Sequence, residues 1–363
     1  MIILHAAETI KGGVATVMNK LIKYQVAQEE VKDLICLIPS DQNENLLNSS
    51  KITTCQFKRN GRSILGMLAF FFSIFRLIIK RKPDVIHLHS SFSGLLGRVA
   101  ILLTGRRKKT KIIYCPHAFG FLMKTSKFKK NIYIYIEKFL SKFTNTIICV
   151  SNNEYENAIK YGFKKDKLIV IHNGVETKSK SNTYIKNNKK HYKLLFVGRF
   201  DYQKGIDILL KSLKILSKKN IQNTYELTLI GESVNNEFKF EFENIKNITI
   251  NKLGWLKQEQ LETYYLNHDA LIIPSRWEGF AMVPLEAMSY GLPIIAKHID
   301  AFKELETDEE KHITFFNDEI ELSAILFNIN NIDLEKNCKL SKKIFLEKFN
   351  DTKMTVNTFL QYK

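Results

Sequence analysis

The chain has 363 residues, of which 45% are hydrophobic and 25% are charged, and its formal net charge is +18 at pH 7. This length is too great for one ordinary hydrophobic core and predicts two domains, while the apolar content excludes a disordered chain. The five cysteines are widely spaced with no C-x-x-C pair, which excludes a disulfide-rich scaffold and favours reduced thiols in a cytoplasmic protein. The opening residues 1–5 are typical of a short strand and not of a secretory signal.

The positive charge is concentrated in the first half of the chain. Residues 1–173 contain 28 Lys and Arg against 11 Asp and Glu, whereas residues 174–363 contain 27 against 26. The first half therefore favours a polyanionic partner, which is nucleic acid, an anionic membrane surface or a phosphate-bearing substrate. A solvated lysine-rich face would account for the charge itself, but it does not explain why the second half is nearly neutral.

Short apolar strands alternate with helical patterns in chain order, and this alternation predicts parallel α/β sheets. The expected strands cover residues 2–5, 33–38, 85–89, 111–115, 146–150, 193–197, 226–230, 248–251, 270–273 and 293–296. Residues 175–192 are rich in Lys, Asn, Ser and Thr and are predicted to be a linker. We expect two facing, Rossmann-like, doubly wound domains, residues 1–174 and 193–340, with the ligand at the carboxyl ends of both sheets. Residues 341–363 are expected to form a C-terminal helix that packs back on the first domain.

Residues 64–75 are almost wholly apolar and are flanked by Lys and Arg on both sides. Such a segment is too short to span a bilayer, which needs about 20 residues. Two interpretations stay open: a buried crossover helix that leads into the strand at 85–89, or a helix in the membrane interface with its basic flanks on anionic lipid. The predicted helix at 127–142 has a similar mixture of aromatic residues and lysines.

Loops that follow predicted strands carry residues suited to binding phosphate. Gly12 and Gly13 lie between the first strand and a helix, where the backbone can approach an anion closely. Arg199 and Lys204 follow the strand at 193–197, and a planar guanidinium with a point-like ammonium can together clamp a diphosphate.

Two carboxylates, Glu278 and Glu286, stand eight positions apart across a loop-to-helix junction. The helix is predicted to begin near Val283, and the N–H groups of its first turn form a seat for an anion. Two carboxylates beside an anion seat suit a ligand with hydroxyls at both ends and phosphate between them. A nucleotide-sugar has this chemistry.

A set of short motifs occurs in a fixed order along nearly the whole chain. The motifs are Gly12-Gly13, Pro116-His117-Ala118-Phe119-Gly120, Val150-Ser151, Asn173-Gly174-Val175, Gly198-Arg199-Phe200 with Lys204-Gly205, Gly231-Glu232, Gly254-Trp255, and Glu278 with Glu286. This set resembles the retaining GT-B glycosyltransferases of family 4, whose E-x7-E motif matches Glu278 and Glu286 in spacing. The resemblance implies the GT-B fold and sugar transfer from a nucleotide donor.

The resemblance also implies a role for each matched residue of the donor site. Glu278 would bind hydroxyls of the donor sugar, and Glu286 would bind the ribose. Arg199 and Lys204 would hold the diphosphate. The backbone around the diphosphate would come from the small or loop positions Gly12, Gly13, Gly279 and Phe280.

His117 would stand near the reacting centre, where it would contact the sugar and stabilise developing positive charge; the alternative is a structural loop histidine. Gly254 and Leu256 would contact the nucleotide. The family mechanism implies front-face attack, in which an oxygen of the leaving phosphate takes the acceptor proton. We expect no metal and no cofactor, because Arg and Lys neutralise the diphosphate and the chain has no D-x-D triplet.

The sequence departs from the family pattern at two places. Ala281 stands where the family usually has Gly or Pro, which is tolerable if its φ is negative. The run Pro293-Ile294-Ile295-Ala296 is followed by Lys297 and no glycine-rich turn. Lys297 is expected to supply a cation in place of the contacts that the glycines would make.

We expect a cytoplasmic enzyme that is peripheral on the inner face of the cell membrane. It would move a sugar, with a UDP-hexose or UDP-N-acetylhexosamine donor favoured, to an undecaprenyl-diphosphate-linked saccharide in O-antigen or capsule assembly. The alternatives are a glycosyltransferase with a soluble acceptor, a nucleotide-sugar 2-epimerase, and a basic nucleic-acid-binding protein. We expect no nucleic-acid partner, because the chain contains no recognisable module that interleaves basic and aromatic residues.

Overall fold

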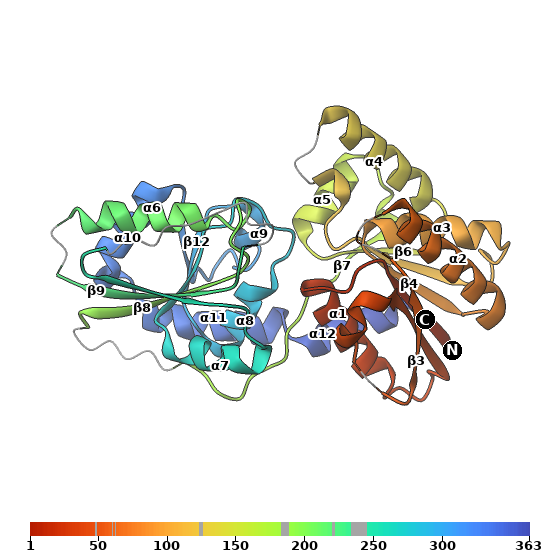
Figure 1. Ribbon diagram of the computed structural model, residues 1–363, viewed down its shortest axis with the longest axis horizontal. Helices are drawn as coiled ribbons and strands as arrows, with labels where there is room; N and C mark the ends of the chain where they lie inside the picture. The colour runs from red at the N-terminus through yellow and green to blue at the C-terminus, as the bar shows by residue number, and fades with distance from the viewer. Residues whose placement is uncertain are drawn as a thin grey trace. The chain divides into compact units, whose positions relative to one another are not determined.

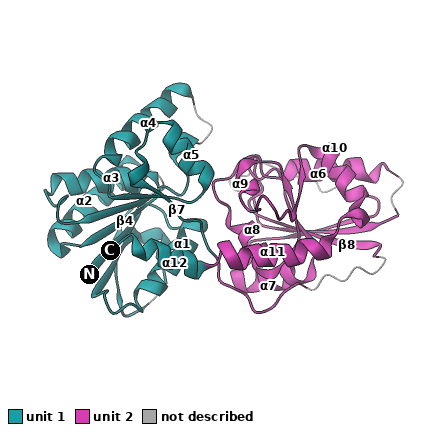
Figure 2. Ribbon diagram, turned by 180° about the vertical axis from the view of Figure 1, so that it is seen from behind, with its two compact units in different colours: residues 1–174, 351–363 teal, residues 175–350 magenta. Residues whose placement is uncertain are grey.

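The computed structural model describes residues 1–47, 49–59, 61, 63–122, 126–182, 189–219, 222–233 and 245–363. The chain divides into two compact units (Figure 2): unit 1 comprises Met1–Gly174 and Asp351–Lys363, and unit 2 comprises Val175–Asn350. The chain therefore leaves unit 1 and later returns to it. Within unit 2 the two crossing points are adjacent, since the Val175 N–H donates to the Phe349 carbonyl at 3.1 Å.

Unit 1 is built on a seven-stranded parallel sheet in the order β3-β2-β1-β4-β5-β6-β7. Its strands are β1 (Ile2–Ala7), β2 (Asp33–Pro39), β3 (Ile52–Phe57), β4 (Val85–His89), β5 (Lys111–Cys115), β6 (Thr146–Cys149) and β7 (Leu168–Val170). Its helices are α1 (Gly13–Gln25), α2 (Ile64–Arg81), α3 (Ser91–Leu103), α4 (Lys127–Ser141), α5 (Asn152–Lys160) and α12 (Asp351–Leu360). Short 3₁₀ turns cover Ser40–Asn45, Gly120–Leu122 and Lys165–Lys167.

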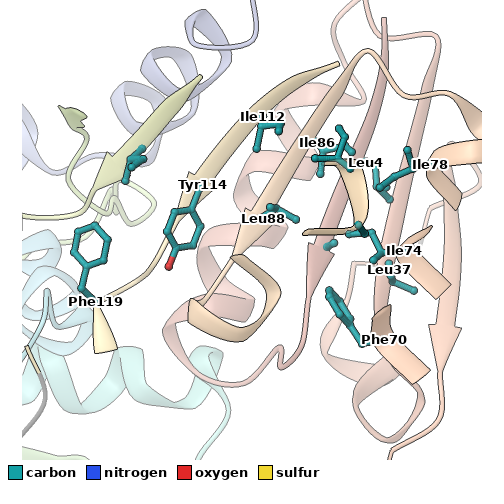
Figure 3. Packing of buried hydrophobic residues seen from close by; sticks show 14 of the residues in the cluster. Leu4, Leu37, Phe70, Ile74, Ile78, Ile86, Leu88, Ile112, Tyr114 and Phe119 are labelled. Carbon is teal, nitrogen blue, oxygen red and sulfur yellow. The ribbon is translucent and has the colours of Figure 1, made fainter. Parts of the chain in front are cut away.

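The helices of unit 1 cover both faces of its sheet (Figure 1). Alternate strand residues point to opposite faces, so Leu4 and Leu37 pack with α2 and α3 in one core cluster (Figure 3). Leu34 and Cys36 of β2 point to the opposite face and pack with α1. The returning helix α12 packs beside α1 on this second face. The face covered by α1 and α12 is the one that matters for the site below.

Unit 2 has a six-stranded parallel sheet in the order β10-β9-β8-β11-β12-β13. Its strands are β8 (His191–Val197), β9 (Thr224–Ile230), β10 (Ile248–Leu253), β11 (Ala270–Ile273), β12 (Ile294–Lys297) and β13 (Ile313–Phe316). Its helices are α6 (Ile206–Ser217), α7 (Gln258–Asn267), α8 (Met282–Tyr290), α9 (Asp300–Lys303), α10 (Glu319–Phe327) and α11 (Leu334–Lys348), with a 3₁₀ turn at Ile329–Asn331. Helices α6 and α10 lie together on one face, and α7, α8 and α11 lie on the other (Figure 1).

Both sheets are doubly wound, so each has one point at which the strand order reverses. This switch point lies between β1 and β4 in unit 1 and between β8 and β11 in unit 2. Loops that leave the carboxyl ends of the two strands diverge there, and open α/β sheets bind their ligands in the resulting crevice.

The prediction of two doubly wound parallel-sheet units is confirmed, but several details differ. Strands β3, β7 and β13 were not predicted; β3 is half polar and lies at a sheet edge, and β7 has only three residues. The expected start of the returning helix at residue 341 is wrong, because it falls inside α11, which packs on α8 within unit 2. The predicted linker is partly structured. Asn182 is buried and donates to the carbonyls of Tyr265 and His268, while residues 183–188 lie outside the described part.

Helix α2 has one face buried, as the crossover interpretation predicts, and one face exposed. Phe70, Ile74 and Ile78 recur at four-residue spacing and are buried against the sheet, as in a crossover helix (Figure 3). The opposite side of α2 leaves Leu65 78% exposed and Phe72 64% exposed. Within the described ranges, no helix combines the length and the apolarity needed to cross a membrane.

Candidate active site

A partly buried ion pair joins the two loops at the switch point of unit 2. Lys204 lies in the loop after β8 and Glu278 in the loop after β11, and Lys204 Nζ is 2.6 Å from Glu278 Oε1. The two side chains are only 19% and 7% exposed. Burial weakens the screening of their attraction, so the pair holds the two loops together at the end of the sheet.

The local chain fixes Lys204 before the ion pair forms. The Lys204 N–H donates to Asp201 Oδ1 at 2.8 Å, which closes a tight turn. Gly205 then begins α6 with a φ of +68°, and a Cβ at this position would lie 2.1 Å from the Pro274 carbonyl oxygen. Only glycine allows this approach, so the β8 loop packs directly on the end of β11.

Arg199 and Arg276 complete the charged groups around these loops. Arg199 donates to Gln203 Oε1 at 2.9 Å, pairs with Asp201 at 3.1 Å and is 43% exposed. Arg276 forms two 2.7 Å hydrogen bonds to the carboxylate of Asp207, and its guanidinium stacks 3.8 Å above the ring of Tyr202. The bidentate pair fixes the backbone just before Glu278, whereas Arg199 stays accessible to a ligand.

Helix α8 begins at Met282, one residue before the expected start, and has no side-chain cap. Its N-cap residue Ala281 has a φ of −72°. Because this φ is negative, alanine is tolerated where the family usually has Gly or Pro. The preceding Gly279 is half-buried and Phe280 is buried against the ring of Phe349. The first-turn N–H groups of α8 therefore have no side-chain cap, and the loop before them is anchored by the buried ring of Phe280.

Glu286 lies in the second turn of α8, and Tyr265 of α7 donates to its Oε2 at 2.8 Å. Burial, and then the carboxylate of Glu286, raise the pKa of Tyr265 well above its usual value. The phenol therefore stays a hydrogen-bond donor and orients the carboxylate.

The two residues predicted for the nucleotide lie farther from the switch point. Gly254 is exposed and Leu256 is half-buried, and both lie between β10, an edge strand, and α7. Nearer the centre, Gly231 has a φ of +134°, and a Cβ there would lie 2.0 Å from the Gly198 carbonyl oxygen. Lys297, expected to act as a cation, donates to the Asn317 carbonyl.

The predicted residues of unit 1 lie after β1 and after β5. Gly12 precedes α1 with a φ of +56°, and Gly13 is the first residue of that helix, which has no side-chain cap. His117 and Ala118 have φ values of +53° and +99°, a conformation that costs about 1–3 kcal/mol per residue outside glycine. Such strain persists only where the surrounding structure holds the backbone in place.

Glu154 is the group that holds the His117 loop. This carboxylate is 2% exposed, and its Oε1 accepts from the N–H groups of Ala118 at 3.1 Å and Phe119 at 2.9 Å. Its Oε2 accepts from the Val150 N–H at 2.7 Å. A buried carboxylate with three backbone donors thereby clamps the strained loop to the end of β6.

His117 also contacts a group of histidines that was not predicted. His5 of β1 and His87 and His89 of β4 are buried on the α1 and α12 face of the sheet, and His89 Nδ1 lies 3.1 Å from His117 Nε2. A sequence signal existed, because His87 and His89 alternate in an apolar strand and must share one face.

The ring nitrogens of His5, His87 and His89 lie within 4.8 Å of one another, the spacing of a metal site. The rings of His5 and His89 are 16° from parallel, and those of His87 and His89 are 25° from parallel. His5 Nδ1 and His89 Nε2 are 2.9 Å apart in a hydrogen bond.

Comparison with known proteins assigns the chain to a family. Residues 11–179 match the family model described as Glycosyltransferase Family 4, and residues 178–345 match the model described as Glycosyl transferases group 1. An uncharacterized glycosyltransferase of Methanocaldococcus jannaschii is 30% identical over 273 residues, which cover 73% of this chain and 71% of that protein. The chain is a family 4 glycosyltransferase.

Two further relatives are informative. An uncharacterized 41.2 kDa protein in the cps region of Klebsiella pneumoniae is 39% identical over 317 residues, 85% of this chain and 84% of that protein. A UDP-Gal:alpha-D-GlcNAc-diphosphoundecaprenol alpha-1,3-galactosyltransferase of Escherichia coli is 28% identical over 251 residues, 66% of this chain and 64% of that enzyme.

Solved structures agree on the fold, which is GT-B. Sucrose-phosphate synthase from Thermosynechococcus elongatus matches with a TM-score of 0.77 at 16% identity, covering 100% of this chain and 98% of that one. Anabaena HepE in complex with UDP and glucose matches with a TM-score of 0.75 at 15% identity, covering 99% and 98%.

The structure of this glycosyltransferase brings some predicted residues together and leaves others apart. Lys204 and Glu278 are in direct contact, and Arg199 lies in the same loop as Lys204. Gly254 and Leu256 follow a strand that is separated from the switch point by β9. Sequence reasoning missed Glu154 and the histidines of β1 and β4, because their contacts join segments far apart in the chain.

Proposed function

We propose that this glycosyltransferase transfers a hexose or N-acetylhexosamine, with retention of configuration, from a UDP-sugar to an undecaprenyl-diphosphate-linked saccharide. O-antigen or capsular polysaccharide biosynthesis is the process that such a product serves. The observation that carries the proposal is the partly buried Lys204–Glu278 pair beside the uncapped start of α8 and the exposed Arg199. The donor and acceptor named for the Escherichia coli relative, and the UDP bound by HepE, support the same substrate class.

The proposed reaction exchanges one bond at the sugar. An acceptor hydroxyl oxygen bonds to the anomeric carbon as the bond from that carbon to the phosphate oxygen breaks. The hydroxyl proton passes to an oxygen of the leaving phosphate, and UDP departs. Negative charge develops on the diphosphate, where Arg199, Lys204 and the N–H groups of α8 stabilise it.

In this scheme the two glutamates do different work. Glu278, paired with Lys204, orients hydroxyls of the donor sugar near the reacting carbon. Glu286, held by Tyr265, binds the ribose. Glu278→Gln removes a contact that matters most in the transition state, so kcat is expected to fall by at least about 100-fold. Glu286→Gln removes a contact that is equally strong in the bound substrate and in the transition state. The KM for the donor is therefore expected to rise while kcat changes little.

The deciding experiment offers a panel of nucleotide-sugars to the enzyme with a short lipid-diphosphate saccharide and determines the product's anomeric configuration by NMR. Retention with a UDP-sugar supports the proposal, and inversion contradicts it. Equal transfer to a soluble saccharide would favour a soluble acceptor. An altered sugar nucleotide formed without acceptor would indicate a 2-epimerase.

The acceptor suggests that unit 1 works at an anionic membrane surface. Helices α2 and α4 both pack against α3 and so lie on one face of the sheet. They expose Leu65 and Phe72 from α2 and Phe128 and Tyr135 from α4, each more than 60% exposed. Unit 1 also carries most of the surplus Lys and Arg. Exposed apolar side chains next to cations suit a helix that lies in the headgroup region.

Vesicles containing phosphatidylglycerol test this surface. The double variant Leu65→Ser with Phe72→Ser is expected to lower binding by about tenfold or more, since each large apolar side chain contributes about 1.5–3 kcal/mol on full burial. Replacing Arg106, Arg107, Lys108 and Lys109 by Ala should also weaken binding. The matched control is Ile320→Ser in unit 2, which is 66% exposed and should have no effect. Unchanged binding by all variants would remove the membrane from the proposal.

A further inference from the structure

A chain of hydrogen bonds leads from His117 through the interior of unit 1 to the C-terminal residues. His117 Nε2 lies 3.1 Å from His89 Nδ1, and His89 Nε2 lies 2.9 Å from His5 Nδ1. His5 Nε2 lies 2.7 Å from Gln25 Oε1, and Gln25 Nε2 lies 3.2 Å from the hydroxyl of Tyr362. Gln25, His5 and His89 are fully buried, and Tyr362 is 4% exposed. His117, at the other end of the row, is half-buried.

The rings of this chain are neutral. Burial lowers the pKa of His5 and of His117 to about 4, and it lowers the pKa of His89 well below its usual value. A neutral imidazole has one N–H donor and one lone-pair acceptor. The proton position on one ring therefore determines the proton position on the next.

The amide of Gln25 gives the chain its direction. Its Oε1 can only accept, so His5 must carry its proton on Nε2. His5 Nδ1 is then an acceptor and takes the proton of His89 Nε2. His89 Nδ1 in turn accepts from His117 Nε2. The proton of His117 is thereby placed on Nε2, and its Nδ1 keeps a lone pair.

The opposite end of the row links the amide to His87. Gln25 Nε2 donates to the Tyr362 hydroxyl at 3.2 Å, and in this orientation the hydroxyl proton is available to His87 Nδ1, which lies 2.5 Å from the same oxygen. His87 lines a small cavity of about 10 Å³, close to the room that one water needs. Turning the amide over would reverse every bond of the chain. The reversed row would need Tyr362 to donate to Gln25 and His87 Nδ1 to carry a proton, so Tyr362 couples the orientation of the amide to the tautomer of His87.

We infer that Gln25 and Tyr362 are positioning residues that fix the tautomer of His117 through His5 and His89, so that His117 Nδ1 accepts a hydrogen bond from a hydroxyl of the bound sugar. The contact with sugar rests on the function proposed above, but the tautomer does not. The strained loop clamped by Glu154 sets where the ring lies, and the hydrogen-bond chain sets which nitrogen it presents.

The tautomer can be measured without any substrate. Protein labelled with ¹⁵N-histidine gives long-range ¹H–¹⁵N correlation spectra that report which nitrogen of each ring is protonated, and His117→Asn assigns the His117 signals. The expected result at pH 7.5 is a single His117 tautomer with the proton on Nε2. A proton on Nδ1, or an equal mixture, would overturn the inference.

Variants of Gln25 test what sets the direction. Gln25→Met keeps the shape but removes the acceptor, so His117 is expected to become a mixture of tautomers. Gln25→Glu keeps an acceptor for His5 and is expected to retain the Nε2 proton on His117. The matched control is Gln28→Met just after the same helix, where Gln28 donates to the Tyr24 carbonyl and lies outside the hydrogen-bonded row. An unchanged His117 spectrum in Gln25→Met would show that Gln25 does not set the tautomer of His117.

Tyr362→Phe decides the question if Gln25→Met fails to fold, since it removes the hydroxyl that holds the amide and should also mix the tautomers. Activity gives an independent readout. For Gln25→Met the kcat/KM for the donor is expected to fall about tenfold, the effect of one lost hydrogen bond. If His117 has the expected tautomer but the enzyme transfers no sugar, only the proposed function is rejected. If the enzyme transfers sugar but His117 lacks the expected tautomer, only this inference is rejected.

Discussion

The two switch points of this glycosyltransferase are built with opposite electrostatics. In unit 2 the cations Arg199, Lys204 and Arg276 each pair with a carboxylate at 3.1 Å or less. In unit 1 the corresponding position holds buried histidines, and burial lowers the pKa of each well below neutrality. The unit 2 site therefore contains paired charges, whereas the unit 1 site contains hydrogen bonds between neutral groups.

The difference matches what each site would do. Paired charges can regroup when a diphosphate arrives, because a cation that leaves its carboxylate finds another anion at once. Neutral rings carry little charge to exchange, but each passes its proton position to the next. The unit 2 site is thus suited to bind and stabilise an anion, and the unit 1 site is suited to present one atom in one protonation state.

The largest expected effect comes from breaking the charge pair of unit 2. Lys204→Met removes a cation at the developing diphosphate charge, so kcat is expected to fall about 10²–10³-fold. It also leaves the carboxylate of Glu278 buried without Lys204, which lowers the free energy of unfolding. Adding Glu278→Gln should restore stability but not transfer. The control is Lys211→Met, at an exposed position of α6, and recovery of activity in the double variant would contradict the assigned roles.

The second prediction removes the clamp on the unit 1 loop. Glu154→Ala leaves three backbone N–H groups without their acceptor and releases the strained His117 backbone. Each buried unpaired donor costs about 1–3 kcal/mol, and partial relaxation of the loop leaves an expected loss of about 3 kcal/mol of unfolding free energy. Urea denaturation measures it, and exposed Glu156→Ala on the same helix is the control. A loss no larger than that of the control would refute the clamp.

The third prediction uses pH to address the neutral histidines. Their folded pKa values lie below the unfolded value of 6.5, with His5 and His117 at about 4. The unfolded chain therefore binds more protons below pH 6.5, and the free energy of unfolding falls as the pH drops from 6.5 towards 4. The slope approaches about 1.4 kcal/mol per pH unit for each fully buried histidine. Urea titrations at pH 8.5, 7.5 and 5.5 should show no histidine-dependent change between the first two and a clear loss at the third.

The smallest expected effect sharpens the role of Glu286. Tyr265→Phe removes the hydroxyl that orients this carboxylate, so the KM for the donor is expected to rise about threefold to tenfold with kcat nearly unchanged. Isothermal titration with UDP alone should show the same weakening. If kcat falls while UDP affinity is unaffected, Glu286 contacts the reacting sugar and not the ribose.

Much of the fold was accessible from the sequence because its signals are local. Apolar runs of four to seven residues fix the strands, and the glycines after β1 and β8 mark the turns into α1 and α6. Glu278 and Glu286 were found because their spacing spans one loop and one helical turn. The edge strand β3 was not predicted because its polar residues leave it only half apolar.

The sequence by itself determined the two parallel sheets, the loops that carry Arg199 and Lys204, and the helix that carries Glu286, since each follows from periodicity among neighbouring residues. Only the tertiary structure decided that Lys204 pairs with Glu278 and that His117 connects through His5 to Tyr362. The physical reason is strand order: parallel sheets place β1 beside β4 and return α12 to α1, so residues hundreds of positions apart share one buried row of hydrogen bonds.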